Sequence, residues 1–221
     1  MMNILELKNV GFRYNEKKTV LHDVSCAFET GVFYALVGKS GAGKSTLLSL
    51  MAGLDLPTEG EILFEGQSTA GMDLSEYRRR HASVIYQDFA LLPLLTVQEN
   101  IEYPMALCGM DAAESARTAR ELAARVALNE ELLDRYPSHI SGGEQQRVAI
   151  ARSLTLGRRL LLADEPTGNL DSENSDIVID LLRRLAHEED RCVIVVTHDL
   201  SVMDRADVVY RVRDGMLEKR N

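Results

Sequence analysis

The sequence predicts an α/β fold in which a mostly parallel sheet is covered by helices on both faces. Two patterns indicate this fold: short apolar segments of strand length, and longer segments between them whose apolar residues recur every three or four positions. Strands that are apolar throughout are typical of a parallel sheet buried between helices. With 221 residues, of which 45% are hydrophobic and 27% charged, the chain suits one large domain or a compact two-lobed one.

The first part of the chain contains three strand-like segments, at residues 4–10, 24–28 and 32–37, and the last of them runs directly into a glycine-rich loop. A helix is expected at residues 44–52, and Gly53 is expected to end it. From about residue 96 to 134 the pattern is helical and predicts a separate helical lobe. Its apolar residues lie three or four positions apart: Ala112, Ala116, Ala119, Leu122 and Val126.

After this segment the alternation of strands and helices resumes. Strands are expected at residues 160–163, 192–196 and 208–212, with an amphipathic helix after the first of them. That helix is expected to carry four apolar residues: Ile177, Leu181, Leu182 and Leu185.

The composition limits the classes of protein to which the chain can belong. A formal net charge of −9, from 34 acidic and 25 basic residues, argues against a general nucleic-acid-binding protein. No segment approaches the ~18–20 apolar residues of a membrane span, and the N-terminus lacks the pattern of a secretion signal. Three cysteines without metal-type spacing are expected to be reduced. These features together predict a cytoplasmic protein.

Residues 38–46, GKSGAGKST, match the pattern G-x-x-x-x-G-K-[ST] of a phosphate-binding loop, between a predicted strand and a predicted helix as that loop requires. In such a loop the backbone amides surround the phosphates, Lys44 reaches the outer phosphates and the Ser45 hydroxyl binds Mg²⁺. ATP and Mg²⁺ are therefore the expected cofactors. The expected nucleotide-binding residues are Gly38, Lys39, Ser40, Gly41, Ala42, Gly43, Lys44, Ser45 and Thr46.

Two acidic residues, Asp164 and Glu165, follow the predicted strand at residues 160–163. Open α/β sheets bind ligands at the carboxyl ends of their strands, so Asp164 is expected to hold Mg²⁺. Glu165 is expected to orient or deprotonate the water that attacks the terminal phosphate. The alternative is that the two acids cap the next helix.

Three further residues are candidates for the same site. Gln87 and His198 each follow a predicted strand that should end on the phosphate side, where each would contact Mg²⁺, water or the terminal phosphate. The alternative is that both are ordinary loop residues. Tyr14 alternates with Phe12 along the first strand, so its ring either stacks on adenine or packs on the sheet.

The segment ISGGEQQR, residues 140–147, predicts a helix start that suits an anion. Ser141 and Glu144 have the spacing of a capping box. Gly142 and Gly143 remove side chains from the amides at the positive end of the helix dipole, where a phosphate can approach closely. The alternative is a well-capped surface helix.

Taken in order, these motifs resemble the ATP-binding cassette (ABC) family over essentially the whole chain: Tyr14, GKSGAGKST, Gln87, ISGGEQQR, LLLADEP, the GNLD that ends in Asp171, and His198. The resemblance implies a P-loop NTPase core with a mostly parallel sheet, an N-terminal antiparallel β subdomain and an inserted α-helical subdomain. Residues 1–221 would form a single nucleotide-binding domain. Its RecA-like core and β subdomain would comprise residues 1–87 and 159–221, and its helical subdomain about 88–158.

The family further implies that two chains close head to tail around two ATP molecules. Residues Ser141, Gly142 and Gly143 of one chain would then cover the γ-phosphate held by the other. The same resemblance assigns Tyr14 to adenine stacking, Gln87 to Mg²⁺ binding and signalling, and Glu165 to catalysis. It assigns Asp171 to communication across the dimer and His198 to the γ-phosphate. The expected partner is a second ABC ATPase chain in a homodimer, with no nucleic acid.

Three phrases, LDLPTEGEI, LLPLLTVQEN and PTGNLD, are similar to those of the lipoprotein-release, macrolide-export and antimicrobial-peptide-export group. This similarity implies an ATP hydrolase that drives an integral membrane permease or a force-transmitting membrane partner, and that is peripheral on the inner face of the cell membrane. Alternatives are the ATPase of an amino-acid importer, a soluble ABC ATPase outside transport and a regulatory ATP-binding protein without turnover. The apolar stretch at residues 89–95 is either the rim of a groove for a partner's helix or packing between lobes.

Three positions depart from the family pattern. Ile140 stands where leucine is usual, Lys39 where proline or serine is often found, and Val32 where an acid is common. None of these changes removes a catalytic group, so ATP hydrolysis is still expected.

Overall fold

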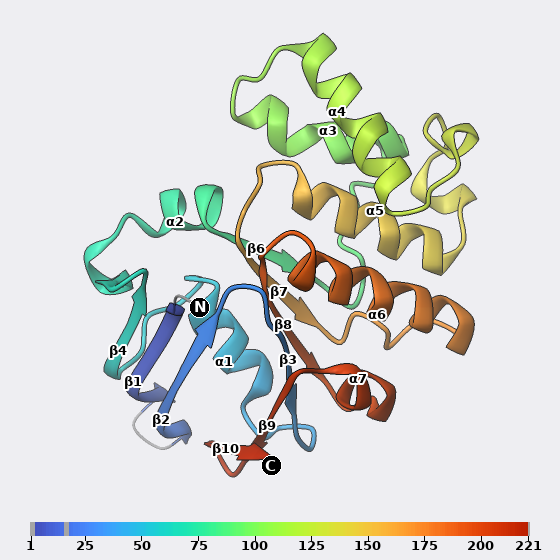
Figure 1. The fold of residues 1–221 in the computed structure, drawn as a ribbon. Helices are drawn as coiled ribbons and strands as arrows, with labels where there is room; N and C mark the ends of the chain where they lie inside the picture. Colours follow the sequence, from blue (N-terminus) through green and yellow to red (C-terminus); the bar gives the residue numbers. More distant parts are fainter. Residues whose placement is uncertain (1–2, 16–17, 221) are drawn as a thin grey trace.

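The computed structural model describes residues 3–15 and 18–220, and the strands of this part form two sheets (Figure 1). The larger sheet has the order β10-β9-β3-β8-β7-β6. Its strands are β3 Phe33–Val37, β6 Ala82–Ile85, β7 Leu160–Asp164, β8 Cys192–Thr197, β9 Val208–Arg213 and β10 Met216–Arg220. Pairing is parallel from β6 through β9, whereas β10 runs antiparallel to β9. The mostly parallel sheet predicted from the apolar segments is confirmed.

The smaller sheet is antiparallel and has the order β2-β1-β4-β5. Its strands are β1 Asn3–Asn15, β2 Lys18–Glu29, β4 Glu59–Phe64 and β5 Gln67–Ser68. β1 and β2 are longer than the apolar segments that predicted them. β1 continues beyond Val10 and β2 begins before Val24, and their pairing contains several register shifts. The antiparallel N-terminal sheet that the family resemblance implied is confirmed.

Helices cover both faces of the larger sheet (Figure 1). They are α1 Lys44–Met51, α2 Leu74–Arg80, α3 Val97–Leu107, α4 Ala112–Arg125, α5 Gly142–Leu154, α6 Ser172–His187 and α7 Leu200–Arg205, with short 3-10 turns η1 Thr69–Gly71, η2 Glu130–Leu132 and η3 Pro137–His139. None of the helices in the described part of the chain is long and apolar enough to cross a membrane.

The residues of β8 show how both faces of the sheet are buried. Val193 and Val195 belong to the hydrophobic cluster that includes α6 and the helices α3 to α5. Ile194 and Val196 belong to the other cluster, which joins α1 to the smaller sheet. Successive strand residues point to opposite faces, so an apolar strand serves two cores at once.

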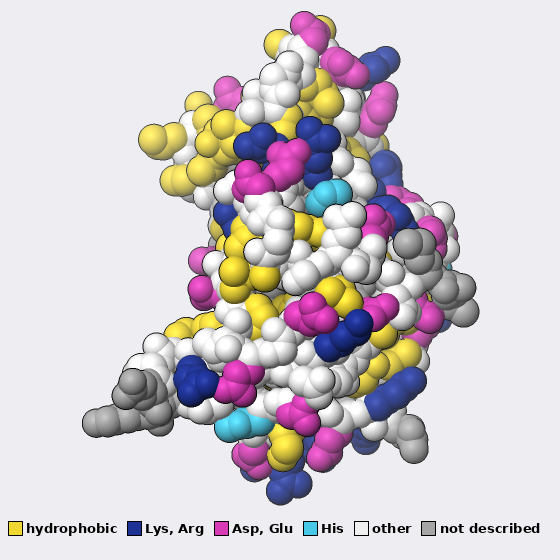
Figure 2. Space-filling model, turned by 90° about the vertical axis from the view of Figure 1, so that its left-hand side faces the viewer, with side chains coloured by type: hydrophobic (Ala, Val, Ile, Leu, Met, Phe, Trp, Pro, Cys, Tyr) yellow, Lys and Arg dark blue, Asp and Glu magenta, His cyan; other side chains and the backbone are white. Residues whose placement is uncertain are grey.

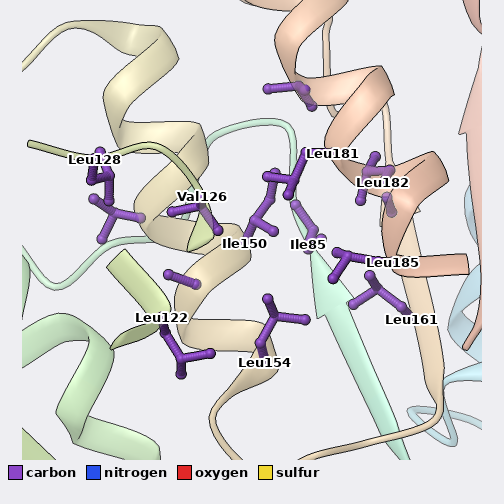
Figure 3. Packing of buried hydrophobic residues seen from close by; sticks show 14 of the residues in the cluster. Ile85, Leu122, Val126, Leu128, Ile150, Leu154, Leu161, Leu181, Leu182 and Leu185 are labelled. Atoms are coloured by element: carbon purple, nitrogen blue, oxygen red, sulfur yellow. The ribbon is translucent and has the colours of Figure 1, made fainter. Parts of the chain in front are cut away.

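Helix α5 joins the helical region to the sheet. Figure 3 shows Ile150 and Leu154 of α5 between Leu122 of α4 on one side and Ile85 and Leu161 of the sheet on the other, all within one cluster of buried side chains. The helices predicted from residue 96 onward are present, but they share a core with the sheet. The exact domain boundaries at residues 87 and 159 stay a prediction.

Two residues of the predicted apolar faces are exposed. Ala112 is exposed at the start of α4, and Ile177 on α6 is 40% exposed. Val178 and Ile179 are buried on α6 instead. The sequence spacing identified each helix correctly, whereas the exact rotation of its buried face depends on the neighbours against which it packs.

Candidate functional site

A cavity of about 590 Å³ at one edge of the larger sheet collects most of the predicted site residues. It is lined by Tyr14, Val20, Gly38, Lys39, Ser40, Gly41, Gly43, Lys44, Ser45, Thr46, Gln87, Glu165 and His198. Val20 was not predicted, because an aliphatic residue in β2 carries no signal of function. Two residues predicted for the same site do not line this cavity. Ala42 lines an adjoining cavity, and Asp164 accepts a hydrogen bond from Ser45, which does line it.

The glycine-rich loop connects β3 to α1 and forms the floor of this cavity. Gly43 precedes the helix with φ of +104°, a conformation that residues with a side chain rarely adopt. A Cβ atom there would also lie 2.9 Å from Cδ2 of Leu21 and 3.1 Å from the carbonyl oxygen of Val20. No side chain caps α1. The first amides of the helix, at the positive end of its dipole, therefore face the cavity as an anion-binding position.

The ammonium group of Lys44 is held at the centre of the loop. Lys44 is only 8% exposed, and its Nζ donates hydrogen bonds to the carbonyl oxygens of Gly38, at 2.8 Å, and Lys39, at 3.3 Å. These bonds offset the cost of burying the charge. They also fix a positive charge where the loop amides converge.

Oxygen atoms suited to a magnesium ion lie beside the loop. The Ser45 hydroxyl donates to Oδ1 of Asp164 at 3.4 Å. Burial raises the pKa of the Asp164 carboxyl, as does neighbouring Glu165, while the bond from Ser45 and the charge of Lys44 oppose the shift. Within the described residues, no group of three or more His, Cys, Asp and Glu side chains could hold a metal ion. The Ser45 hydroxyl and the Asp164 carboxylate nevertheless fit Mg²⁺, which is bound by one or two carboxylates and completes its shell with water and phosphate oxygens.

Glu165 and His198 form a pair that sequence reasoning did not predict. Nδ1 of His198 lies 3.0 Å from Oε1 and 2.9 Å from Oε2 of Glu165, and the His198 amide donates to Oε2 at 3.3 Å. With Nδ1 bound to the carboxylate, Nε2 of the imidazole remains for a different partner. The two residues are 33 positions apart in sequence, and the parallel pairing of β7 with β8 brings them together.

The backbone of Glu165 has a conformation that is unusual for a residue with a side chain. Its φ is +47°. Its amide donates to the carbonyl oxygen of Val196 at 2.8 Å, and its carbonyl oxygen accepts from the amide of Gly168 at 3.0 Å. Such conformations cost about 1–3 kcal/mol and persist where the surroundings fix them. The strained backbone therefore holds this carboxylate at a defined position in the cavity.

Gln87 follows β6 and is among the residues that line the cavity. Its side chain lies against Gly168, where an added Cβ would be only 2.9 Å from Nε2 of Gln87. Its carbonyl oxygen accepts a hydrogen bond of 3.0 Å from Nδ2 of Asn169. The residue is therefore fixed by the turn that follows Glu165.

Tyr14 lines the cavity and is 61% exposed. Its ring meets Phe12 edge to face, with centroids 5.0 Å apart, and its hydroxyl lies 3.1 Å from Oγ1 of Thr46. An exposed aromatic ring held in this way offers a surface on which a planar base can stack.

The segment that begins with Ser141 lies outside this cavity. The predicted capping box is confirmed: the Ser141 amide donates to Oε2 of Glu144 at 2.7 Å, and the Glu144 amide donates to the Ser141 hydroxyl at 3.4 Å. Burial opposes ionisation of Glu144, but bonds from Ser141 and the charges of Arg147 and Arg135 lower the pKa of its carboxyl. Neither this segment nor Asp171 is among the residues that line the cavity.

Gly143 has a packing role that sequence reasoning missed. A Cβ at this position would lie 2.1 Å from Oδ1 of Asn174 in α6, so a side chain cannot fit there without movement. Nδ2 of Asn174 donates to both carboxylate oxygens of Asp171, at 3.1 and 2.9 Å, and its Oδ1 accepts from Arg147 at 3.2 Å. Asn174 thus links the start of α5 to Asp171, the N-cap residue of α6. No local pattern in the sequence singles out an asparagine inside a helix for this role.

This packing predicts different effects for alanine at two neighbouring glycines. Gly143→Ala is expected to lower the free energy of unfolding by about 1–3 kcal/mol, because the new methyl group overlaps Asn174. Gly142→Ala is the matched control, since a Cβ there would meet its nearest neighbours at 3.7–3.8 Å and alanine favours a helix. Urea denaturation of both variants measures the difference. Equal stability of the two would contradict the packing role of Gly143.

A family model described as ABC transporter matches residues 21–168, more than half of the chain. The ABC transporter ATP-binding protein YclH of Bacillus subtilis is 38% identical over 215 residues, which cover 97% of this chain and 95% of YclH. The macrolide export ATP-binding/permease protein MacB of Brucella melitensis is 42% identical over 201 residues, which cover 90% of this chain but 31% of MacB.

Among solved structures, the dimeric ATP-binding cassette MJ0796 in a post-hydrolysis state, bound to ADP and Pi, matches with a TM-score of 0.88 and 36% identity. The match covers 98% of this chain and 99% of that one. Fold, family model and near full-length relatives therefore agree: the chain belongs to the ABC transporter family of ATP-binding proteins.

Proposed function

We propose that the chain is the ATP-hydrolysing subunit of an ABC transporter of the export or lipoprotein-release type, and that two copies of it close around two ATP molecules. The observation that carries this proposal is the division of the motifs. The phosphate loop, Glu165 and His198 line one cavity, whereas Ser141 lies outside it at the start of another helix. In a dimer, each chain would therefore contribute its phosphate loop to one ATP site and its Ser141 helix start to the other.

In the proposed reaction the chain positions ATP and water by fixed charges. Lys44 and the first amides of α1 bind the phosphate oxygens, and Tyr14 stacks on the adenine. Ser45, Asp164 and Gln87 would hold Mg²⁺, which neutralises charge on the phosphates. Glu165 accepts a proton from the attacking water, and His198, oriented through Nδ1 by Glu165, presents Nε2 to the γ-phosphate. The positions of these side chains in and beside the cavity support the proposed roles.

The second chain would complete the site by supplying its own helix start. The amides at Gly142 and Gly143 carry the positive end of the α5 dipole and can receive the γ-phosphate bound by the first chain. Asp171 lies beside this segment through Asn174, which supports a role in communication across the dimer. The MJ0796 cassette, 36% identical to this chain, is dimeric, which supports a dimer, and a homodimer is the form that we propose.

A surface for a membrane partner is proposed on the helical part. In the space-filling view, hydrophobic side chains gather over the upper part of the face shown (Figure 2). Leu94 is 87% exposed, although its loop is well fixed. Asn100, fully buried, accepts from the Leu92 amide at 2.8 Å and donates to the carbonyl oxygens of Leu92, Leu95 and Thr96 at 2.9–3.0 Å. A rigid loop that presents a large apolar side chain to solvent suits a partner's helix.

This surface, together with the likeness to the permease-fused MacB, supports a peripheral position on the inner face of the cell membrane. The alternatives of an amino-acid importer ATPase or a soluble ABC ATPase differ in their partners. Co-purification of the chain with an integral membrane protein supports the proposal, whereas association with ribosomes or DNA contradicts it.

Turnover provides a second test of the proposal. Phosphate release from ATP should require Mg²⁺ and stop when EDTA removes the metal, because the phosphate charge is then no longer neutralised. ATP binding without hydrolysis under all conditions would support a purely regulatory protein instead.

A further inference from the structure

The segment that follows Gln87 has a backbone conformation that its residues disfavour. Phe89 and Ala90 are consecutive, neither is a glycine, and their φ angles are +62° and +47°. In this left-handed region the Cβ of an L residue crowds the next carbonyl oxygen, so the segment keeps its shape only where its surroundings hold it. The turn is tight, since the Ala90 amide donates to the carbonyl oxygen of Asp88 at 2.7 Å.

Arg152 of α5 binds this segment with both ends of its guanidinium. Nη1 donates to the carbonyl oxygen of Ala90 at 2.7 Å, and Nη2 donates to that of Phe89 at 3.0 Å. A planar fork can bond two neighbouring carbonyls at once, which a lysine ammonium on its flexible chain does less well. Arg152 is half-buried, and burial lowers the pKa of its guanidinium, so the two carbonyl oxygens replace hydrogen bonds that water would otherwise supply.

The same segment has two further attachments. The Phe89 ring lies at the start of α5, with Cζ 3.7 Å from where a Cβ of Gly142 would stand. The carbonyl oxygen of Gln87 is held by Asn169, as described above. The segment from Gln87 to Ala90 therefore contacts α5 at its start and at Arg152, and it also contacts the turn after Glu165.

We propose that Arg152 is a positioning residue for ATP hydrolysis, which fixes the strained segment after Gln87 and makes Gln87 move together with α5. This inference rests on the proposed function, in which Gln87 binds Mg²⁺. Ser141 stands at the other end of the same helix. A displacement of α5 when Ser141 meets the nucleotide of the second chain is then transmitted to Gln87 through a rigid pair of hydrogen bonds.

Arg152→Lys in the full chain tests this role, because lysine keeps the charge but loses the two-pronged contact. We expect kcat to fall on the order of tenfold and the Mg²⁺ concentration for half-maximal rate to rise several-fold, since misplacement of a positioned group is costly to the reaction. The affinity for ATP measured in EDTA is expected to stay within about twofold, because the phosphate loop is unchanged. Arg152→Gln, which also keeps a donor group, replaces the lysine variant if that variant does not fold.

Arg158→Lys is the matched control. Arg158 is also half-buried, and its guanidinium donates to the carbonyl oxygen of Arg79 and to the Ser83 hydroxyl, both at 2.9 Å, away from the cavity. Arg158→Lys is expected to lower the midpoint temperature of thermal unfolding about as much as Arg152→Lys does. It should leave kcat and the Mg²⁺ requirement unchanged. If both variants lower the midpoint alike and neither changes kcat or the Mg²⁺ requirement, Arg152 has a structural role only and the inference is overturned.

Two further variants separate the parts of the inference. Ala90→Gly added to Arg152→Lys should recover part of kcat, because glycine adopts a positive φ without strain; no recovery would overturn the role of the strained segment.

Gln87→Ala should itself raise the Mg²⁺ requirement, and adding Arg152→Lys to it should change little more. If Gln87→Ala has no such effect, the proposed role of Gln87 fails and the inference with it. If Gln87→Ala raises the requirement and Arg152→Lys does not, only the inference fails.

Discussion

Glu165→Gln is expected to bind ATP, form a stable dimer and hydrolyse ATP at least ~100-fold more slowly than the wild-type chain, because a carboxamide cannot accept the proton of the attacking water. The variant should keep the local structure. A carboxamide oxygen can still accept hydrogen bonds from Nδ1 and the amide of His198, which the carboxylate accepts now. Phosphate release measures the turnover, and size-exclusion chromatography with ATP measures the dimer.

Glu188→Gln is the matched control for this variant. Glu188 carries the same charge but lies exposed at the end of α6, 3.6 Å from Arg184. Its substitution should change neither turnover nor dimerisation, since an exposed ion pair contributes little. A Glu165→Gln chain that stays monomeric with ATP and releases phosphate at the wild-type rate would contradict both the role of the base and the dimer.

Ser141→Arg is expected to abolish turnover while the isolated chain still binds ATP. A long charged side chain at the start of α5 would obstruct the approach of the second chain's phosphate, whereas the phosphate loop lies elsewhere. Loss of the capping box costs about 1 kcal/mol of stability in addition. Ser141→Ala separates the two effects, because it removes the cap without adding bulk. A loss of ATP binding by the isolated Ser141→Arg chain would show that the segment belongs to the chain's own site.

Mixing two inactive variants gives a sharper test of the shared site. Lys44→Ala removes the lysine that we propose to bind phosphate, and Ser141→Arg is expected to block the helix start. In a mixed dimer, one site carries both defects and the other carries neither. Random pairing of equal amounts should therefore restore roughly a quarter of the wild-type rate, because half of the dimers have one intact site. A mixture as inactive as its components would contradict a site built from two chains.

Several features of the site could be predicted because neighbouring residues determine them. The loop at residues 38–46 needs only its glycines, Lys44 and Ser45 in order, and the capping box needs Ser141 and Glu144 three positions apart. The apolar strands identified the parallel sheet, because only a strand buried on both faces is apolar throughout. Chain order then assigned Glu165 and His198 to strand ends at the cavity, where both lie.

Other features depend on contacts between residues far apart in the chain. The pair of Glu165 with His198 requires β7 and β8 to lie side by side in one register. The need for glycine at Gly143 arises from Asn174, on a different helix. Arg152 looks like an ordinary basic residue near a helix end until its guanidinium is seen on the two carbonyls after Gln87.

Local patterns were enough to predict an α/β chain with a phosphate-binding loop, two acids after a buried strand and a capped helix start, since each pattern consists of a few consecutive residues. Which of these motifs share a cavity depends on how the chain folds in three dimensions. Packing places Glu165 against His198 and leaves Ser141 outside the cavity, at the start of a helix whose Arg152 binds the carbonyl oxygens of Phe89 and Ala90. The physical reason is that local motifs are fixed by backbone geometry, whereas the distance between motifs is fixed by how α5, α6 and the sheet pack into one core.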